Sequence, residues 1–327
     1  MQAITIQTEQ EGHPLVWQTV ADPTYQADEV LVDIQATAIN RADLFQRAGH
    51  YPPPPGASEI LGLEMAGQIK AVGVDVTNWQ VGDRVCALLP GGGYAELVNV
   101  PTDMLMALPD DWSYEQGAAI SEVFLTAYVN LFMEANLQAE ETVLIHGGGS
   151  GVGTAAIQMA RQAGCRVFTT AGTAEKVAYC EKLGAELAIN YKQADFAKQI
   201  QQYTDHKNPV DVILDIVGAD YFARNIQLLN LRGRLVFIST LSGAKTQLDL
   251  RQLMGRRLRV IGSVLRSRSL VEKVEIKQRF LNQFWPSFLD GTIKPIIDSV
   301  YPIQQVNEAH EQIRKNRNIG KIVLKVV

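Results

Sequence analysis

The sequence has little cysteine and no cysteine pair at short spacing. Its 327 residues include only three cysteines, Cys86, Cys165 and Cys180, which lie far apart. An odd number of scattered thiols without Cys-x-x-Cys spacing argues against a disulfide framework and against an all-cysteine structural zinc site. We therefore interpret the three as ordinary thiols of a reducing compartment.

The sequence also lacks a positive charge excess and a long apolar run. It has 30 basic and 35 acidic residues, a balance that argues against nucleic acid as the principal ligand. No apolar run approaches the roughly 18–20 residues needed to cross a bilayer. The first ten residues have neither the basic start nor the apolar stretch of a secretory signal. We expect a cytoplasmic protein that neither spans a membrane nor binds one as a partner.

The length of the chain and the change in its sequence pattern near residue 120 predict two domains. Residues 1–120 contain short apolar runs separated by Gly and Pro, which favours a compact, mainly β domain. After residue 120, apolar strand-like runs alternate with helical spacing every 20–30 residues, a pattern typical of βαβ units around a parallel sheet. Two helices, near 269–289 and 303–315, and a final strand, 320–326, follow. Local reasoning does not place that last strand.

The clearest local signal is a glycine-rich turn between a strand and a helix. The apolar strand 142–146 runs into Gly147-Gly148-Gly149-Ser150-Gly151-Val152-Gly153, and helical spacing follows directly. Glycines let the backbone approach a pyrophosphate, and a helix N-terminus supplies free N–H donors and a positive dipole. The turn predicts a dinucleotide site, with Ser150 where the usual motif has its middle glycine. His146, at the strand end, is interpreted as a core histidine.

The end of the second strand bears on the choice between NAD and NADP. An NAD site normally places an acid at this strand tip, whereas here the chain continues as Thr169-Thr170-Ala171-Gly172-Thr173. The hydroxyl of Thr173 and the ammonium of Lys176 suit a 2′-phosphate. Two alternatives stay open: a shifted register would bring Glu175 nearer, or Lys176 is a solvated charge on the helix surface.

Eight segments spread in order over almost the whole chain carry a family resemblance. They are residues Ala38–Leu44, Tyr51–Ser58, Ile60–Glu64, Ala87–Gly93, Ser150–Gln158, Ile189–Lys192, Leu265–Arg268 and Asn318–Leu324. In these segments the chain resembles the zinc-independent quinone oxidoreductases of the medium-chain dehydrogenase/reductase superfamily, relatives of zeta-crystallin, and looks most like their p53-inducible type.

The resemblance implies an α/β fold with two domains. A GroES-like, mainly β catalytic domain would comprise residues 1–120 and 265–327, split in sequence around a Rossmann NADPH-binding domain, 121–264, with a doubly wound parallel sheet. It also implies a homodimer, often joined through the edge of the cofactor-domain sheet. The strand-like stretch 258–264 fits such an edge.

Comparison with zinc-dependent relatives indicates that the catalytic metal is missing. When the zinc-binding motifs of those relatives are aligned with this chain, Asn40 stands at the position of the first Cys ligand and Leu63 at that of the His ligand. Glu122 stands near the position of the second Cys ligand. Asparagine and leucine do not supply the ligands that zinc prefers. Without zinc, an alkoxide loses its stabilisation, whereas quinones and conjugated carbonyls accept hydride more readily.

The resemblance therefore implies NADPH-dependent reduction of quinones by hydride transfer without metal. Two alternatives stay open. One is an NADPH-dependent reductase of α,β-unsaturated ketones or aldehydes, and the other is a low-turnover NADPH-binding protein of the crystallin kind. In each case the partner is a small molecule.

The candidate site residues form two groups. Around the acceptor, Tyr51 offers a flat ring and a phenol donor or serves loop packing, Asn40 offers an amide donor, and Asp43 orients the loop or the cofactor ribose. The glycine turn and the resemblance together assign cofactor contacts to Thr126, Gly148, Ser150, Gly151, Val152, Gly153, Thr173, Lys176, Tyr191, Thr240, Leu241, Leu265 and Asn318.

Overall fold

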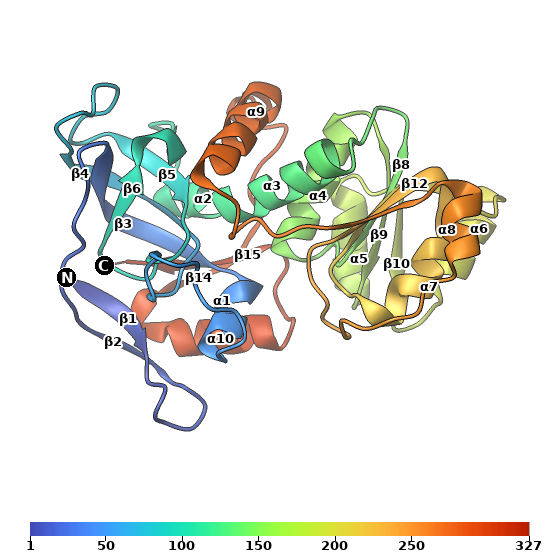
Figure 1. Ribbon diagram of the computed structural model, residues 1–327, viewed down its shortest axis with the longest axis horizontal. Helices are drawn as coiled ribbons and strands as arrows, with labels where there is room; N and C mark the ends of the chain where they lie inside the picture. Colours follow the sequence, from blue (N-terminus) through green and yellow to red (C-terminus); the bar gives the residue numbers. More distant parts are fainter. Residues whose placement is uncertain (327) are drawn as a thin grey trace. The chain divides into compact units, whose positions relative to one another are not determined.

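The computed structural model describes residues 1–326, which form two compact units (Figure 1). The first unit comprises Met1–Leu125, Arg266–Arg279 and the chain from Pro295 onward. The second comprises Thr126–Leu265 and Phe280–Lys294. Helix α9 (Leu270–Leu289) contributes its first half to one unit and its second half to the other. The domain limits expected from the sequence stay a prediction.

The first unit is built on a mainly antiparallel sheet with the strand order β14-β15-β3-β4-β5-β7, in which β6 pairs with β3 and the hairpin β1–β2 stands apart. Short helices flank it. The elements are β1 (Gln2–Ile6), β2 (Leu15–Thr19), β3 (Glu29–Ile39), α1 (Arg41–Arg47), β4 (Glu64–Val72), β5 (Arg84–Leu88), β6 (Leu97–Pro101), β7 (Leu105–Ala107), α2 (Tyr114–Ala118), β14 (Ile297–Pro302), α10 (Val306–Arg314) and β15 (Lys321–Lys325), with single 3₁₀ turns at Thr102–Met104 and Ile303–Gln305.

The final strand, β15, is an interior strand of this sheet and lies next to the edge strand β14. It pairs antiparallel with β3, where Ile322 faces Ile39, and parallel with β14 on its other side. The burial of β15 on both faces explains its continuous apolar sequence from Ile322 to Leu324. Local reasoning could not place this strand because its partner lies near the other end of the chain.

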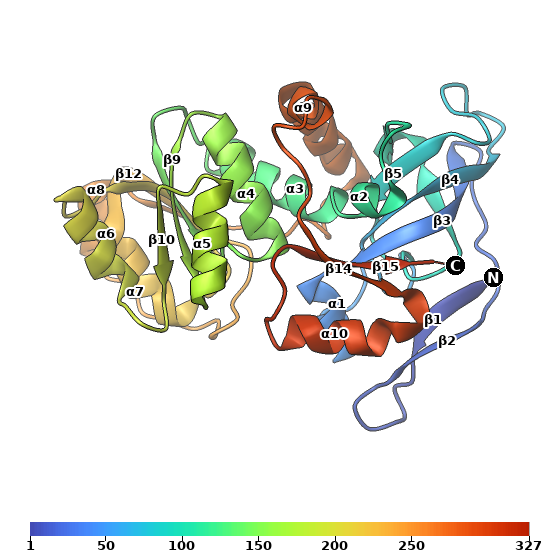
Figure 2. The same cartoon turned by 180° about the vertical axis from the view of Figure 1, so that it is seen from behind.

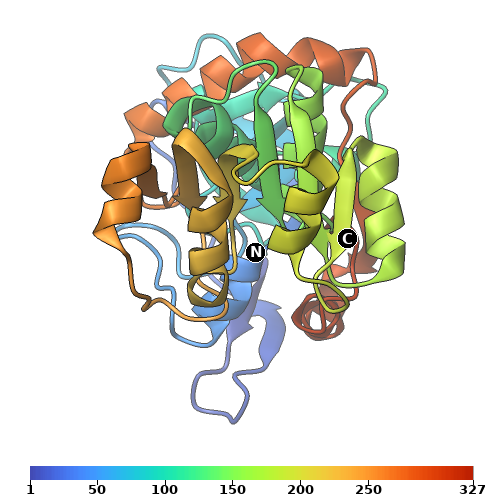
Figure 3. The same ribbon diagram turned by 90° about the vertical axis from the view of Figure 1, so that its right-hand side faces the viewer.

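The second unit is a parallel six-stranded sheet with the order β10-β9-β8-β11-β12-β13. Figures 1 and 2 show α4 and α5 on one face of this sheet and α6 and α7 on the other. In Figure 3 the side with α6, α7 and α8, drawn yellow to orange, is turned toward the viewer. The elements are β8 (Thr142–His146), α4 (Gly151–Gln162), β9 (Arg166–Ala171), α5 (Ala174–Leu183), β10 (Leu187–Asn190), α6 (Phe196–Thr204), β11 (Val210–Asp215), α7 (Ala219–Leu228), β12 (Leu229–Phe237), α8 (Leu250–Arg256) and β13 (Arg259–Gly262); α3 (Ser121–Tyr128) and a π-helical turn (Val129–Glu134) precede them.

Right-handed crossovers in both directions from β8 produce this doubly wound order. The sheet core forms where apolar strands are covered on both faces, as at Leu144, Phe168, Ile213 and Leu235. Strand β8 is buried along its whole length. The predicted α/β class, with a mainly β unit and a Rossmann unit, is confirmed.

Side-chain caps begin four helices of the second unit. Ser150, Thr173, Asp195 and Asp249 each accept a hydrogen bond from a backbone N–H of the first turn of α4, α5, α6 and α8 respectively. Gly184 ends α5 with φ +112°, in the left-handed region that favours glycine. Within residues 1–326, no helix is both long and apolar enough to cross a bilayer.

Candidate functional site

The carboxyl ends of the parallel strands bring most of the candidate cofactor residues to one edge of the second unit. The glycine turn follows β8, Thr173 follows β9, Tyr191 follows β10, and Thr240 and Leu241 follow β12. The strand order reverses between β8 and β11, and doubly wound sheets bind ligands at this switch point. Residues that are far apart in the sequence therefore share one face of the sheet edge.

The glycine turn is tightly packed against its own helix. A Cβ at Gly153 would lie 2.2 Å from the Gly147 carbonyl oxygen, so a side chain there would displace the backbone. The Ser150 hydroxyl accepts a hydrogen bond from the Gly153 N–H at 3.0 Å and begins α4. The sequence assigns Ser150 to the cofactor contacts, and in the structure its hydroxyl oxygen caps the helix. The first turn of a helix also has further N–H groups without a partner inside the helix, and these are the donors that a pyrophosphate requires.

Lys176 and Tyr191 lie beside glycines at the same edge. A Cβ at Gly149 would lie 3.0 Å from Cδ of Lys176, and a Cβ at Gly172 would lie 2.8 Å from the Tyr191 hydroxyl oxygen. The Lys176 side chain therefore runs along the glycine turn, and the phenol of Tyr191 lies against the loop that follows β9. The Thr173 hydroxyl oxygen accepts a hydrogen bond from the backbone N–H of Lys176 at 3.2 Å.

A buried polar chain holds three strand ends at this edge. His146, at the end of β8, contacts Thr170 Oγ1 through Nδ1 at 3.0 Å and Asn225 Oδ1 through Nε2 at 2.8 Å. Asn225 in turn donates to Asp215 at 2.5 Å. Burial lowers the pKa of His146 to about 4, which keeps its ring neutral, and raises the pKa of Asp215 to about 6. This chain is structural, and it fixes the loops that follow β8, β9 and β11.

The remaining cofactor candidates have separate surroundings. Thr240 packs on Gly218, where a Cβ would lie 2.9 Å from the Thr240 Cα, while the Leu241 side chain is half exposed. Leu265 is buried, and the carbonyl of Thr126 accepts from Asn130 Nδ2 at 2.7 Å. Asn318 belongs to the first unit, where its amide donates to the Gly320 carbonyl at 2.7 Å.

In the first unit, Asn40 and Glu64 form a buried network with Lys321. The Lys321 ammonium donates to Glu64 Oε1 and Asn40 Oδ1, both at 2.7 Å, and to the Ile39 carbonyl at 2.9 Å. The Asn40 amide donates to Glu64 Oε1 at 2.9 Å. Both hydrogen-bonding ends of Asn40 are therefore engaged with an internal ion pair. We conclude that Asn40 positions this network.

Asp43 lies in a second buried cluster beside it. Its carboxylate accepts from the Asn40 N–H at 2.7 Å, the Gly62 N–H at 3.2 Å and the Tyr94 hydroxyl at 3.0 Å. Since Tyr94 uses its proton for Asp43, its oxygen accepts from His310 Nε2 at 3.2 Å. Complete burial raises the pKa of Asp43 to about 6 despite these donors. These contacts tie the start of α1 to the Gly62 turn, so the loop-orienting role fits Asp43.

Tyr51, at the start of the proline loop, is covered by Arg266. The Arg266 guanidinium lies 5.2 Å from the centre of the Tyr51 ring, a cation–π contact. Arg266 also donates to the Pro90 carbonyl at 2.8 Å and to Gln46 Oε1 at 2.8 Å. Burial first, and then the charge of Glu122, raises the pKa of Tyr51, so its phenol keeps its proton at neutral pH. One face of the ring is thus held rigidly.

Sequence reasoning did not identify the polar partners of these residues. Lys321, Arg266, Tyr94 and His310 each complete a cluster through contacts between distant parts of the chain. A signal was nevertheless present for Lys321 and Glu64. Each is an ionisable residue within an otherwise apolar stretch, and such residues are buried only with a partner.

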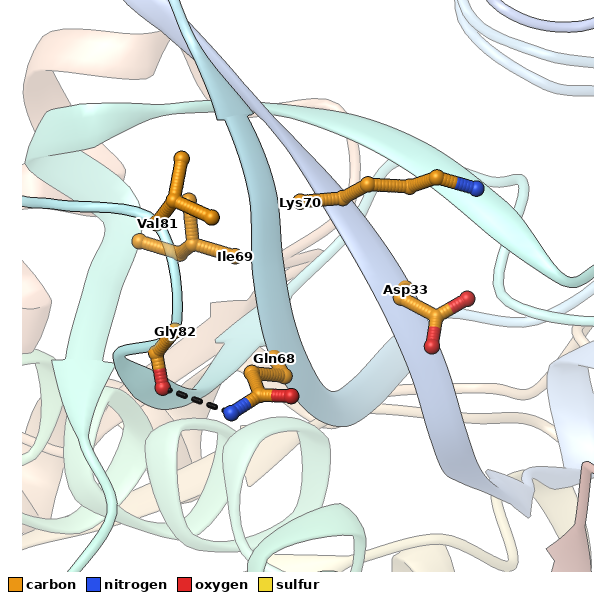
Figure 4. Close-up of a pocket in the computed structure, with 6 residues that line it drawn as sticks. All are labelled: Asp33, Gln68, Ile69, Lys70, Val81 and Gly82. Atoms are coloured by element: carbon orange, nitrogen blue, oxygen red, sulfur yellow. Dashed lines mark hydrogen bonds between the residues drawn. The ribbon is translucent and has the colours of Figure 1, made fainter.

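Two surface hollows of the first unit lie apart from the candidate residues. One, with a volume of about 280 Å³, is lined by Asp33, Lys70 and neighbours, and Figure 4 shows the Gln68 amide donating to the Gly82 carbonyl at 2.8 Å across it. The other, of about 340 Å³, has lining that includes Gly56–Ser58 and Pro90–Gly92. Tyr51, Asn40 and Asp43 line neither hollow.

The Glu64–Lys321 pair makes a testable contribution to stability. Lys321→Met removes the cation and leaves a buried carboxylate unpaired, so we expect the free energy of unfolding in urea to fall by about 3–5 kcal/mol. The matched double variant Glu64→Gln/Lys321→Met removes both charges and should recover most of this loss. A single variant as stable as the parent protein would show that the pair is not needed for folding.

Comparisons with known proteins agree with this architecture. Residues 26–110 match the family described as alcohol dehydrogenase GroES-like domain, and residues 151–278 match the family described as zinc-binding dehydrogenase. The quinone oxidoreductase of Mus musculus is 32% identical over 319 residues, which cover 96% of this chain and 95% of the relative. The quinone oxidoreductase of Homo sapiens is 31% identical over 307 residues, which cover 93% of this chain and 91% of the relative.

Solved structures show the same relationship. The Escherichia coli quinone oxidoreductase, solved with NADPH, has a TM-score of 0.89 and 29% identity and covers 99% of this chain and all (100%) of its own. The CurK enoyl reductase has a TM-score of 0.85 and 27% identity, and the match covers 100% of this chain and 99% of that structure's chain. Together with the glycine turn and the split β unit, these likenesses confirm the resemblance seen in the sequence: the chain is an oxidoreductase and belongs to the quinone oxidoreductase family of the medium-chain dehydrogenase/reductase superfamily.

Proposed function

We propose that this protein reduces quinones with NADPH, by hydride transfer and without a metal ion. The observation that carries the proposal is the placement of Lys176 beside the glycine turn and of Tyr191 beside the loop that follows β9. The Lys176 side chain lies along Gly149, and the Tyr191 phenol lies against Gly172. An ammonium and a phenol at this edge, with no acid at the end of β9, suit the 2′-phosphate of NADPH.

The turn itself fits the pyrophosphate of NADPH. The N-terminus of α4 offers N–H donors and a positive dipole end, and its glycines leave no side chain in the way. When bound, NADPH supplies a hydride from its nicotinamide ring. Gly148, Gly151, Val152 and Gly153 would line the phosphates. Thr126, Thr240, Leu241, Leu265 and Asn318 stay candidates for the ribose, nicotinamide and phosphate sides.

The Lys321 network supports a reaction without metal. The Asn40 and Glu64 oxygens that could otherwise contact a cation are already bound by the Lys321 ammonium, each at 2.7 Å. A positive charge at this place opposes a second cation, and Leu63 offers no donor atom. The donor set therefore does not fit catalytic zinc.

Tyr51 is the residue we assign to the acceptor. Arg266 covers one ring face at 5.2 Å, which stiffens the ring within the proline loop. The phenol keeps its proton, so it can donate to a carbonyl oxygen that gains negative charge as hydride arrives. Asn40 and Asp43 hold the surrounding loop and act as positioning residues.

A reductase of α,β-unsaturated ketones or aldehydes is the second candidate. The likeness to the CurK enoyl reductase favours it, because conjugated carbonyls accept hydride at carbon in the same geometry.

We further propose a homodimer that forms through β13. This strand ends the six-stranded sheet, and Val260 and Val264 expose 41% and 49% of their surface beside it.

The function is tested by following NADPH and NADH oxidation with ortho-quinones, para-quinones and enones, with oxygen consumption measured in parallel. We expect rapid oxidation of NADPH with quinones. Faster turnover of enones would favour the second candidate. Tight NADPH binding without turnover of any acceptor would contradict both and favour a crystallin-like role.

Lys176 should determine the preference for NADPH. A charge-assisted contact with phosphate contributes roughly 1.5–3 kcal/mol, so Lys176→Ala should raise the KM for NADPH by about ten- to a hundred-fold and leave that for NADH nearly unchanged. Lys182→Ala, at the other end of α5, is the matched control and should change neither. If NADPH and NADH bind the parent protein equally in calorimetry, the 2′-phosphate assignment is wrong.

Tyr51 should affect the acceptor and leave the cofactor unaffected. Tyr51→Phe keeps the ring and loses the donor, so it should mainly lower kcat, and Tyr51→Ala should lower kcat/KM further. NADPH affinity should stay within about three-fold for both variants. Loss of NADPH binding with quinone turnover intact at saturating cofactor would overturn this role, and no change in either variant would show that Tyr51 only packs the loop.

A further inference from the structure

Arg266 is a buried cation without a carboxylate partner. Only 5% of its surface is exposed. Its guanidinium donates to three neutral oxygens, which are the Pro90 carbonyl at 2.8 Å, the Gln46 side chain at 2.8 Å and the Tyr51 carbonyl at 3.4 Å. Among the described residues, 1 to 326, no acid forms an ion pair with it. Since buried charges are usually paired, the positive charge of Arg266 is left uncompensated beside the groups it contacts.

The guanidinium is fixed against one face of the Tyr51 ring. It lies 5.2 Å from the ring centre, within the range of a cation–π contact. Its two hydrogen bonds at 2.8 Å reach Gln46 on α1 and Pro90 after β5, so they hold it from two sides. All four residues belong to the first unit. The charge therefore stays at a fixed distance from the phenol.

The hydroxyl group of Tyr51 is uncommitted. In the part of the chain that the structure describes, Tyr51 forms hydrogen bonds only through its backbone, and its hydroxyl is not enclosed by the protein. The phenol of Tyr94 differs, because it is completely buried and donates to Asp43 at 3.0 Å. Tyr51 thus combines a hydroxyl that can donate to a ligand with a cation fixed behind its ring.

A positive charge beside a phenol stabilises the phenolate and makes the O–H group a stronger hydrogen-bond donor. Resting on the proposed function, in which Tyr51 donates to the acceptor, we propose that the unpaired charge of Arg266 strengthens this hydrogen bond as the acceptor oxygen becomes negative. Arg266 acts through Tyr51 and is a positioning residue. Because its guanidinium occupies one face of the ring, a flat acceptor stacks only on the other.

Removing the charge should affect turnover only where the phenol is present. We expect Arg266→Gln to lower kcat for quinones about ten-fold and to keep the KM for NADPH within about three-fold. In the Tyr51→Phe background the same change should alter kcat by less than about two-fold. Arg266→Lys keeps a charge, and its kcat should lie at least about three-fold above that of Arg266→Gln. Arg279→Gln, the same change at an exposed arginine of α9, is the control and should leave kcat unchanged.

Gln46→Glu tests the charge with Arg266 in place. The new carboxylate would accept from the guanidinium as the Gln46 amide does at 2.8 Å, and it would compensate the positive charge. We expect kcat to fall about as far as in Arg266→Gln, whereas a role limited to stiffening the ring predicts no loss. Gln68→Glu is the matched control and should keep the parent kcat. Gln68 donates to the Gly82 carbonyl as Gln46 donates to the Glu59 carbonyl, so both changes lose the same kind of bond.

Ultraviolet titration measures the phenol directly. The difference between each protein and its Tyr51→Phe counterpart isolates Tyr51 among the ten tyrosines. Burial and the charge of Glu122 raise the pKa of Tyr51, whereas the charge of Arg266 lowers it. The midpoint should therefore move upward when the charge is removed or compensated. Glu122, Asp43 and Lys273, which also act on this pair, are the same in every variant.

The outcomes separate this inference from the function on which it rests. If the parent protein reduces quinones but Arg266→Gln and Gln46→Glu keep its kcat and its Tyr51 midpoint, Arg266 does not strengthen the donor while the proposed function stands. Equal losses of kcat with and without the Tyr51 hydroxyl would also overturn the inference. If Arg266→Gln does not fold, Gln46→Glu decides alone. If the parent protein oxidises no NADPH with any acceptor, the proposed function itself fails.

Discussion

The ion pair between Glu64 and Lys321 is the interaction on which the first unit depends. Glu64 is completely buried, and its carboxylate accepts hydrogen bonds from Lys321 on β15, Asn40 at the end of β3 and the backbone of Glu122 on α3. A buried charge is costly unless such donors surround it. The pair therefore holds β15 beside β3 and engages the side chain of Asn40. The proposal that this donor set does not fit a metal ion follows from the same arrangement, because the Lys321 ammonium already binds the oxygens of Glu64 and Asn40.

The second unit depends on sterics more than on charge. Its glycine turn brings backbone atoms so close that a Cβ at Gly153 would lie 2.2 Å from a carbonyl oxygen. That closeness is possible only without side chains, and it leaves the first turn of α4 open toward a phosphate. The buried chain from His146 through Asn225 to Asp215 then holds the neighbouring strand ends in place. We propose that the two long side chains of Lys176 and Tyr191 add specificity for a phosphorylated ribose.

Local signals predicted the second unit well because its elements are formed by neighbours in the chain. The expected strand at 142–146 and the expected helix ending at Gln162 agree with β8 and α4. The first unit was harder, since β15 pairs with β3 and Lys321 reaches Glu64 across most of the sequence. Pattern alone gave Glu122 only as a lost zinc position, because the hydrogen bond from its backbone N–H to Glu64 joins segments that are far apart in the sequence. The site assignments themselves stay predictions.

Hydride transfer without metal is the central claim, and one measurement tests it most directly. The protein would be depleted of metal until none is detectable, and its quinone-dependent oxidation of NADPH would be compared with that of NADPH carrying deuterium at the transferred position. We predict an undiminished rate in the depleted protein and a primary isotope effect on the single-turnover oxidation. Loss of turnover on depletion with recovery on added zinc would contradict the claim.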